Sequence, residues 1–145
     1  MQSLELRLCR YGLLALGAGS SIYLFARSAA LPSPALSLWM GSLPTLLHTA
    51  AFALLSLAVV APWPRLAPAV CAAWILVESA FEALQLPAVA ELTRASAIAP
   101  DSTLLRAYLH GTFDPLDIVA AALGALLAGW IAACSRSGAH GRRDR

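Results

Sequence analysis

Four long apolar stretches organise the chain, and few charged residues interrupt them. They cover residues 11–26, 43–61, 67–86 and 116–134. Three of them approach the roughly 20 residues that a helix needs to cross the hydrocarbon core of a bilayer, and the first is slightly shorter. Because that core offers no water to backbone polar groups, such runs predict membrane-spanning helices. The pattern therefore predicts an all-α fold, a membrane four-helix bundle with up-down topology.

The connections between these runs differ in length and character. Residues 61–68, APWPRLAP, are short and rich in proline, so the second and third helices should form a tight antiparallel hairpin. The connection before the second run contains Trp39 among leucines and prolines, and we expect it to lie on the membrane surface. Apolar residues at helical spacing in residues 101–111 predict a short interfacial helix between the third and fourth spans.

These features predict one transmembrane domain over residues 1–135, followed by a basic tail over residues 136–145. The tail contains arginine, glycine and serine, and we expect it to be disordered against the anionic inner leaflet. The first apolar run also fits a cleavable signal peptide, because Arg7 and Arg10 precede it and small residues follow it. We expect the run to remain attached, since its removal would leave three spans.

Composition and charge strengthen the membrane interpretation and orient the chain. Charged residues make up 12% of the sequence, against about 25% in soluble domains, and the mean hydropathy is +0.71. All ten basic residues are arginines, and the four-span topology places seven on the side of the termini and three on the other. Because cytoplasmic loops carry the excess of positive charge, both termini should be cytoplasmic in a multi-pass protein of the inner membrane.

The polar residues of the spans should gather at one end of the bundle. One polar residue lies near the start of the second predicted helix, three lie in the second half of the third helix, and two lie at the start of the fourth. In an up-down bundle all of these positions meet near the outer membrane surface. The residues concerned are His48, Glu78, Glu82, Gln85, Asp114 and Asp117.

Spacing indicates how these side chains share a face. Glu78, Glu82 and Gln85 follow one another at i, i+4 and i+7, which places them on one side of a helix. A carboxylate facing lipid would cost several kcal/mol, so Glu82 should face the bundle interior, which favours a functional role. Asp114 and Asp117 have an alternative role as caps at a helix start, where negative charge is stabilised. For His48 the alternative is a neutral imidazole bonded to one of these carboxylates.

Three blocks of sequence carry a resemblance to a known family. They are LHTAAFALLSL at 47–57, ESAFEALQL at 78–86 and GTFDPLDIVAAALGALLAGW at 111–130. In order and spacing they resemble the signature blocks of the VanZ-like family of small bacterial membrane proteins. His48 matches the histidine of the first block, and Glu82 with Gln85 matches the E-x-x-Q pair of the second.

The last block matches the family less completely. Asp117 stands at the aspartate of the family's D-x-x-x-N pattern and Gly124 at its glycine. The position that usually holds asparagine is Ala121, so this chain departs from the family at one polar residue. The resemblance implies a four-helix membrane protein of the cell envelope, in the best-known case linked to resistance to the glycopeptide antibiotic teicoplanin.

The function that we expect is binding rather than transport. An outer pocket built from the six polar residues would bind a lipid head group, a glycan or a related envelope component, without a cofactor or metal ion. Membrane lipids or a lipid-linked glycan would be the partners, other membrane proteins could assemble with the chain, and no motif points to nucleic acid. Two alternatives remain: an intramembrane enzyme with Glu82 or Asp117 as base and His48 as acid or base, and a proton or ion pathway.

Overall fold

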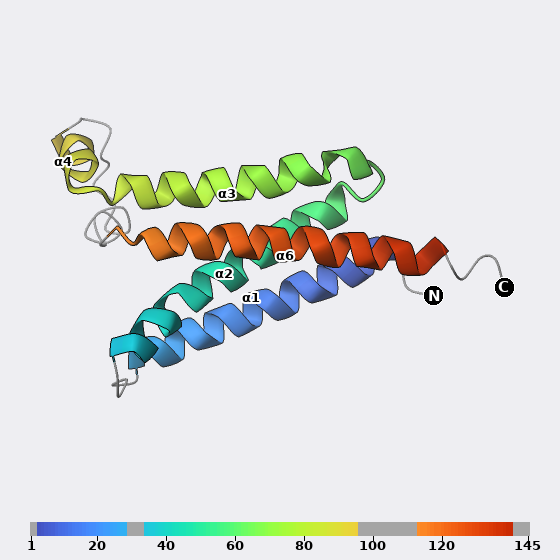
Figure 1. Cartoon of the computed structure of the whole chain (residues 1–145), viewed down its shortest axis with the longest axis horizontal. Helices are drawn as coiled ribbons and strands as arrows, with labels where there is room; N and C mark the ends of the chain where they lie inside the picture. The colour runs from blue at the N-terminus through green and yellow to red at the C-terminus, as the bar shows by residue number, and fades with distance from the viewer. Residues whose placement is uncertain (1–2, 29–33, 96–112, 141–145) are drawn as a thin grey trace.

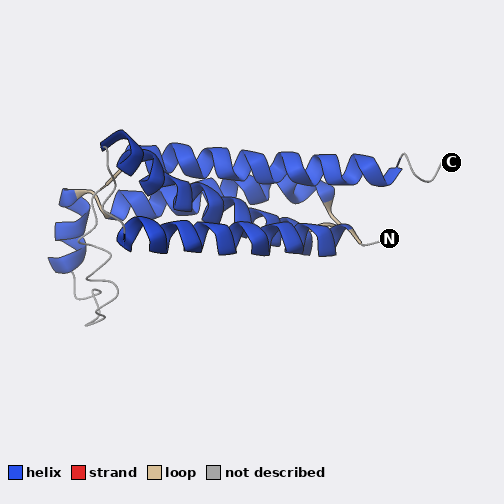
Figure 2. Ribbon diagram, turned by 90° about the horizontal axis from the view of Figure 1, so that it is seen from below, coloured by secondary structure: helices blue, strands red, loops and turns tan. Residues whose placement is uncertain are grey.

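Four long helices form a bundle in the computed structural model, which describes residues 3–28, 34–95 and 113–140 (Figure 1). The described ranges contain helices and turns but no strand, as Figure 2 shows. The predicted all-α fold and four-helix bundle are therefore confirmed. The four helices are α1 (Leu4–Ser28), α2 (Pro34–Val59), α3 (Ala67–Leu84) and α6 (Pro115–His140).

All four helices contain a segment that is long and apolar enough to cross a membrane. These segments are Leu4–Phe25, Met40–Val59, Pro64–Leu84 and Pro115–Ser137. They correspond to the four apolar runs of the sequence, although the first begins seven residues earlier than the run suggested. The chain is thus a multi-pass membrane protein, and the side chains on the outside of the bundle face lipid.

The short elements follow from proline positions. A 3-10 turn, Pro64–Leu66, joins α2 to α3, and the two helices pack as the predicted hairpin. The helix α3 ends at Leu84, and Pro87 then opens a further short helix, α4 (Pro87–Ala95). The residue before a proline is kept out of the helical conformation, which explains the break between α3 and α4.

Two further boundaries differ from the prediction. The helix α2 begins at Pro34, so that much of the expected surface connection is helical and Pro44 lies inside the helix. Proline suits the first turn of a helix, and prolines inside membrane helices are tolerated where neighbours satisfy the freed backbone. The helix α6 continues to His140, so residues 136–140 are helical rather than disordered. The interfacial helix predicted at 101–111 lies outside the described residues.

The helices alternate in direction. The start of α1 and the end of α6 lie at one end of the bundle, and the end of α3 and the start of α6 lie at the opposite end, as do the end of α1 and the start of α2 (Figures 1 and 2). At the end with the termini, the Arg7 guanidinium donates a hydrogen bond of 2.8 Å to the carbonyl oxygen of Ser135, which joins α1 to α6. The arrangement is the predicted up-down topology.

Helix α2 lies at the centre and packs against α1, α6 and, over a smaller area, α3. Most of its buried partners are alanines, which let membrane helices approach closely. The central cluster consists of Leu8, Ala53, Leu54, Leu57, Ala58, Ala128 and Ala132. Beside it, Trp74 of α3 stacks on Phe52 of α2 at 5.1 Å and donates its Nε1 proton to Ser56 Oγ at 3.0 Å.

The helices α2 and α6 cross at very short range at Gly124. A Cβ atom on this residue would overlap the carbonyl oxygen of Leu46 and lie 3.1 Å from the backbone nitrogen of Ala50. Backbone atoms cannot swing aside as a flexible side chain can. Glycine is therefore required here by the separation of the two helices, independently of any conformational demand.

We expect Gly124→Ala to lower stability by about 1 to 3 kcal/mol, the usual cost of overpacking, because its methyl group would push α6 away from α2. Thermal unfolding of the purified protein in detergent measures the effect. Gly17→Ala is the matched control, because a Cβ at Gly17 meets nothing within 4 Å. Equal melting temperatures for the two variants would contradict the close crossing.

Candidate functional site

Carboxyl side chains from α3 and from the start of α6 meet at the end of the bundle opposite the termini. Glu78 and Glu82 lie on α3, and Asp114 and Asp117 lie at the beginning of α6; all four are half-buried. Glu78 interacts electrostatically with Glu82 and Asp117, and Glu82 interacts with both aspartates. The structure therefore brings these four predicted residues together, and we call them the carboxylate cluster.

Glu82 holds the start of α6 in place. Its Oε2 accepts a hydrogen bond of 3.1 Å from the backbone N–H of Asp114. The side chain of Asp114 in turn accepts a hydrogen bond of 2.9 Å from the backbone N–H of Leu116. The backbone carbonyl of Asp114 accepts one of 3.0 Å from the backbone N–H of Asp117. Asp114 thus caps the helix, as the alternative interpretation of this residue predicted. Glu82 links α3 to that cap.

Hydroxyl groups of α2 complete the surroundings of the cluster. Thr49 lies beside Glu78, while Ser42 and Thr45 lie beside Asp117. These residues occur at i, i+3 and i+7, and therefore share one face of α2. These three hydroxyl residues are not among those predicted from the sequence. Their spacing was the available signal, but it becomes informative only when that face is known to meet α6.

Two polar atoms within this region are buried without a hydrogen bond to the described part of the chain. They are Ser42 Oγ and Asp117 Oδ1. The Ser42 hydroxyl is near enough to stabilise the Asp117 carboxylate, but the two atoms do not reach standard hydrogen-bond geometry. A buried polar group left unpaired costs about 1 to 3 kcal/mol. Both atoms are thus available to a polar group of a ligand.

His48 lies elsewhere, and the predicted grouping must be corrected. Its Nε2 is 3.3 Å from Ser20 Oγ, and it packs close to Gly19, so its contacts are with α1. Successive residues of a helix point about 100° apart. His48 therefore faces α1, while Thr49 next to it faces α3. Gln85 is half-buried at the C-terminal cap of α3, one turn beyond Glu82, at the same end of the bundle as the cluster.

The cluster is far from the arginines whose side chains the structure describes. The start of α1 carries Arg7 and Arg10, the turn between α2 and α3 carries Arg65, and the end of α6 carries Arg136; these segments lie at the end of the bundle opposite α4 (Figure 1). The last turn of α1 and the helix α4, at the cluster's end, carry Arg27 and Arg94, whose side chains are outside the described part of the chain. Within the described ranges, no three His, Cys, Asp or Glu residues are placed so that they could hold a metal ion. What the arrangement offers is a set of carboxylate and hydroxyl oxygens, which suits amine and hydroxyl donors.

Comparisons with known proteins were made by family model, by sequence and by structure. No family model matches the chain, and neither a curated protein nor a solved structure is significantly similar to it.

We expect Glu82→Ala to destabilise the protein by about 1 to 3 kcal/mol, because it removes a charged acceptor from the buried N–H of Asp114. Thermal unfolding in detergent measures the change. Glu82→Gln, which retains an acceptor oxygen, should lose less stability. Glu91→Ala on the exposed surface of α4 is the control and should leave the melting temperature unchanged. If Glu82→Ala has the same melting temperature as the wild type, the hydrogen bond from Asp114 to Glu82 does not stabilise the position of α6.

Proposed function

We propose that the chain is a VanZ-like protein of the cell envelope whose carboxylate cluster binds the amine- or hydroxyl-bearing head group of an envelope lipid. One observation carries the proposal. Four carboxyl groups from α3 and the start of α6 lie together between membrane helices, close enough to interact electrostatically. The proteins of this family that the sequence resembles act in the envelope, which fits such a ligand.

Electrostatics supports this chemistry. Like charges at close range repel one another, and the repulsion grows where the surroundings exclude water. A cationic amine placed among the carboxylates removes this repulsion and forms charge-assisted hydrogen bonds, which are stronger than neutral ones. Sugar or glycerol hydroxyls bind more weakly but use the same acceptors. An anionic head group would add to the repulsion and should be rejected.

The contacts of His48 favour binding over acid–base catalysis. The enzymatic alternative pairs a carboxylate of the cluster with the His48 imidazole, whereas that imidazole lies against Ser20 of α1. A proton or ion pathway has less support, because the central cluster of Leu and Ala residues between the carboxylates and the far end of the bundle is apolar. We therefore infer a receptor site at one membrane surface.

A head-group competition tests the proposal. The purified protein is placed in mixed micelles with equal amounts of phosphatidylethanolamine and phosphatidylglycerol that carry the same acyl chains, and native mass spectrometry counts the retained lipids. We expect a preference of about tenfold for the amine lipid, which corresponds to about 1.4 kcal/mol. Glu82→Gln and Asp117→Asn should each remove most of it, and the double variant should add little because the two residues are coupled.

Glu91→Gln is the matched control, since it removes an exposed carboxylate of α4 and should leave the preference intact. Equal retention of both lipids by the wild type would refute an amine-binding site. A preference that survives in the double variant would place the binding elsewhere.

The orientation of the chain gives a separate prediction. The distribution of arginines predicts that both termini are cytoplasmic, and in that orientation the carboxylate cluster lies at the outer leaflet. Reporter domains fused after Arg145 and inserted within residues 96–105 should report opposite sides of the membrane, with the C-terminal fusion cytoplasmic. An extracytoplasmic C-terminus would move the cluster to the inner leaflet.

A further inference from the structure

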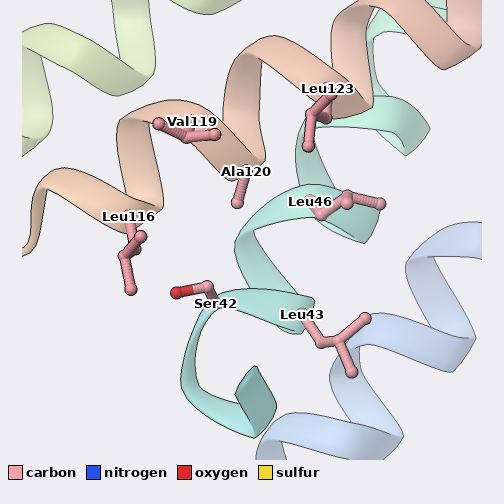
Figure 3. Close-up of a pocket in the computed structure, with 7 residues that line it drawn as sticks. All are labelled: Ser42, Leu43, Leu46, Leu116, Val119, Ala120 and Leu123. Atoms are coloured by element: carbon pink, nitrogen blue, oxygen red, sulfur yellow. The ribbon is translucent and has the colours of Figure 1, made fainter. Parts of the chain in front are cut away.

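A cavity of about 320 Å³ lies between α2 and α6, beside the carboxylate cluster (Figure 3). One lining residue, Ser42, is polar, and the other six are apolar. Those from α2 are Leu43 and Leu46, and those from α6 are Leu116, Val119, Ala120 and Leu123. The cavity is therefore a hydrocarbon-lined space with one hydroxyl group in its wall.

The cavity opens sideways into the membrane. Its lining residues all belong to the spans Met40–Val59 and Pro115–Ser137. On the α6 side, the side chains of Leu116, Val119 and Leu123 are 41%, 54% and 52% exposed, so this wall is continuous with the outer surface of the bundle. At this depth the surface is covered by lipid chains rather than by water. A hydrocarbon chain can thus enter from the side.

The size of the cavity limits what can fill it. An apolar cavity of roughly 150 Å³ takes up benzene, so a volume of 320 Å³ accommodates a longer hydrocarbon segment. It is at the lower end of the roughly 300 to 1,000 Å³ that ligand sites span. The space therefore suits part of one acyl chain rather than a whole lipid with two chains.

Ser42 indicates which chemical group accompanies that chain. It is 9% exposed, and its Oγ has no hydrogen-bond partner in the described part of the chain. In Figure 3 the oxygen points into the space between the helices, toward Leu116 of α6. The same side chain lies beside Asp117. The hydroxyl thus stands at the junction between the apolar cavity and the carboxylate cluster.

We propose that this cavity holds one acyl chain of an ester-linked lipid whose ester carbonyl accepts a hydrogen bond from Ser42. In such a lipid the carbonyl stands between chain and head group, as Ser42 stands between the cavity and Asp117. The proposal rests on the proposed function in one respect, since the head group is the one assigned to the carboxylate cluster. It adds the ester linkage of the lipid and the position of its acyl chain, neither of which the carboxylate cluster specifies.

The linkage is tested with an ester lipid and an ether lipid. The full chain is presented with equal amounts of diacyl and dialkyl phosphatidylethanolamine of equal chain length, and native mass spectrometry measures retention of each. Because the ether lacks the carbonyl, we expect the wild type to retain the ester lipid about three- to tenfold better, the range of one hydrogen bond. Ser42→Ala should abolish this difference, whereas Ser21→Ala on the exposed side of α1 should preserve it.

The position of the acyl chain is tested by a substitution that fills the cavity. Ala120→Leu adds three carbon atoms to its wall, and we expect it to reduce retention of both lipids about tenfold. Ala133→Leu makes the same change on the exposed side of α6 and should have no effect. If Ala120→Leu does not fold, the proposal is tested by the ratio of retained ester lipid to retained ether lipid, compared between the wild type and Ser42→Ala.

Several outcomes would overturn the proposal. Equal retention of ester and ether lipids by the wild type refutes the role of Ser42, and unchanged retention in a folded Ala120→Leu refutes the cavity. A change of oligomeric state in Ala120→Leu at unchanged lipid retention would show that a second copy of the chain fills the cavity. Failure of the head-group site is distinguishable, because it removes the preference for amine over glycerol but leaves the preference for ester over ether.

Discussion

The close contact of α2 with α6 at Gly124 is the constraint on which the rest of the bundle depends. The absence of a side chain there lets the backbone of α6 lie against Leu46 and Ala50 of α2. Asp117 precedes Gly124 by seven residues, about 10 Å along the helix, and so comes to lie beside Ser42 and Thr45. A larger separation would remove these hydroxyls from the carboxylate. One backbone contact thus fixes both the helix packing and the polar site.

The two ends of the bundle have different physical character. Toward the termini, α1, α2 and α6 pack through leucines and alanines. At the other end, the acidic side chains are satisfied in part by backbone N–H groups and by hydroxyls of α2. A lipid bilayer penalises isolated charges, so acids are tolerated only where such partners converge. The site is consequently confined to one end of the bundle.

The sequence predicted the helices and most of the carboxylate cluster, because both depend on properties that extend over many residues. Long apolar runs predict spans, and alternating spans bring the end of α3 to the start of α6. The predictions that were wrong concern the direction in which a side chain points around its helix axis. His48 and Thr49 are neighbours in sequence, yet a rotation of about 100° directs them to α1 and α3. The hydroxyls of α2 were missed for the same reason, since no periodicity shows which face meets α6.

Of the four long helices, α3, which carries Glu78 and Glu82, packs least against the rest of the bundle. Every residue of α3 remains at least partly exposed. Side-chain hydrogen bonds join it to the rest of the bundle at its middle, from Trp74 to Ser56, and near its C-terminal end, between Glu82 and Asp114. The surrounding bilayer therefore supplies much of the packing that this helix has. Because α3 depends on that packing, the membrane itself is a structural component of the site to which its glutamates belong.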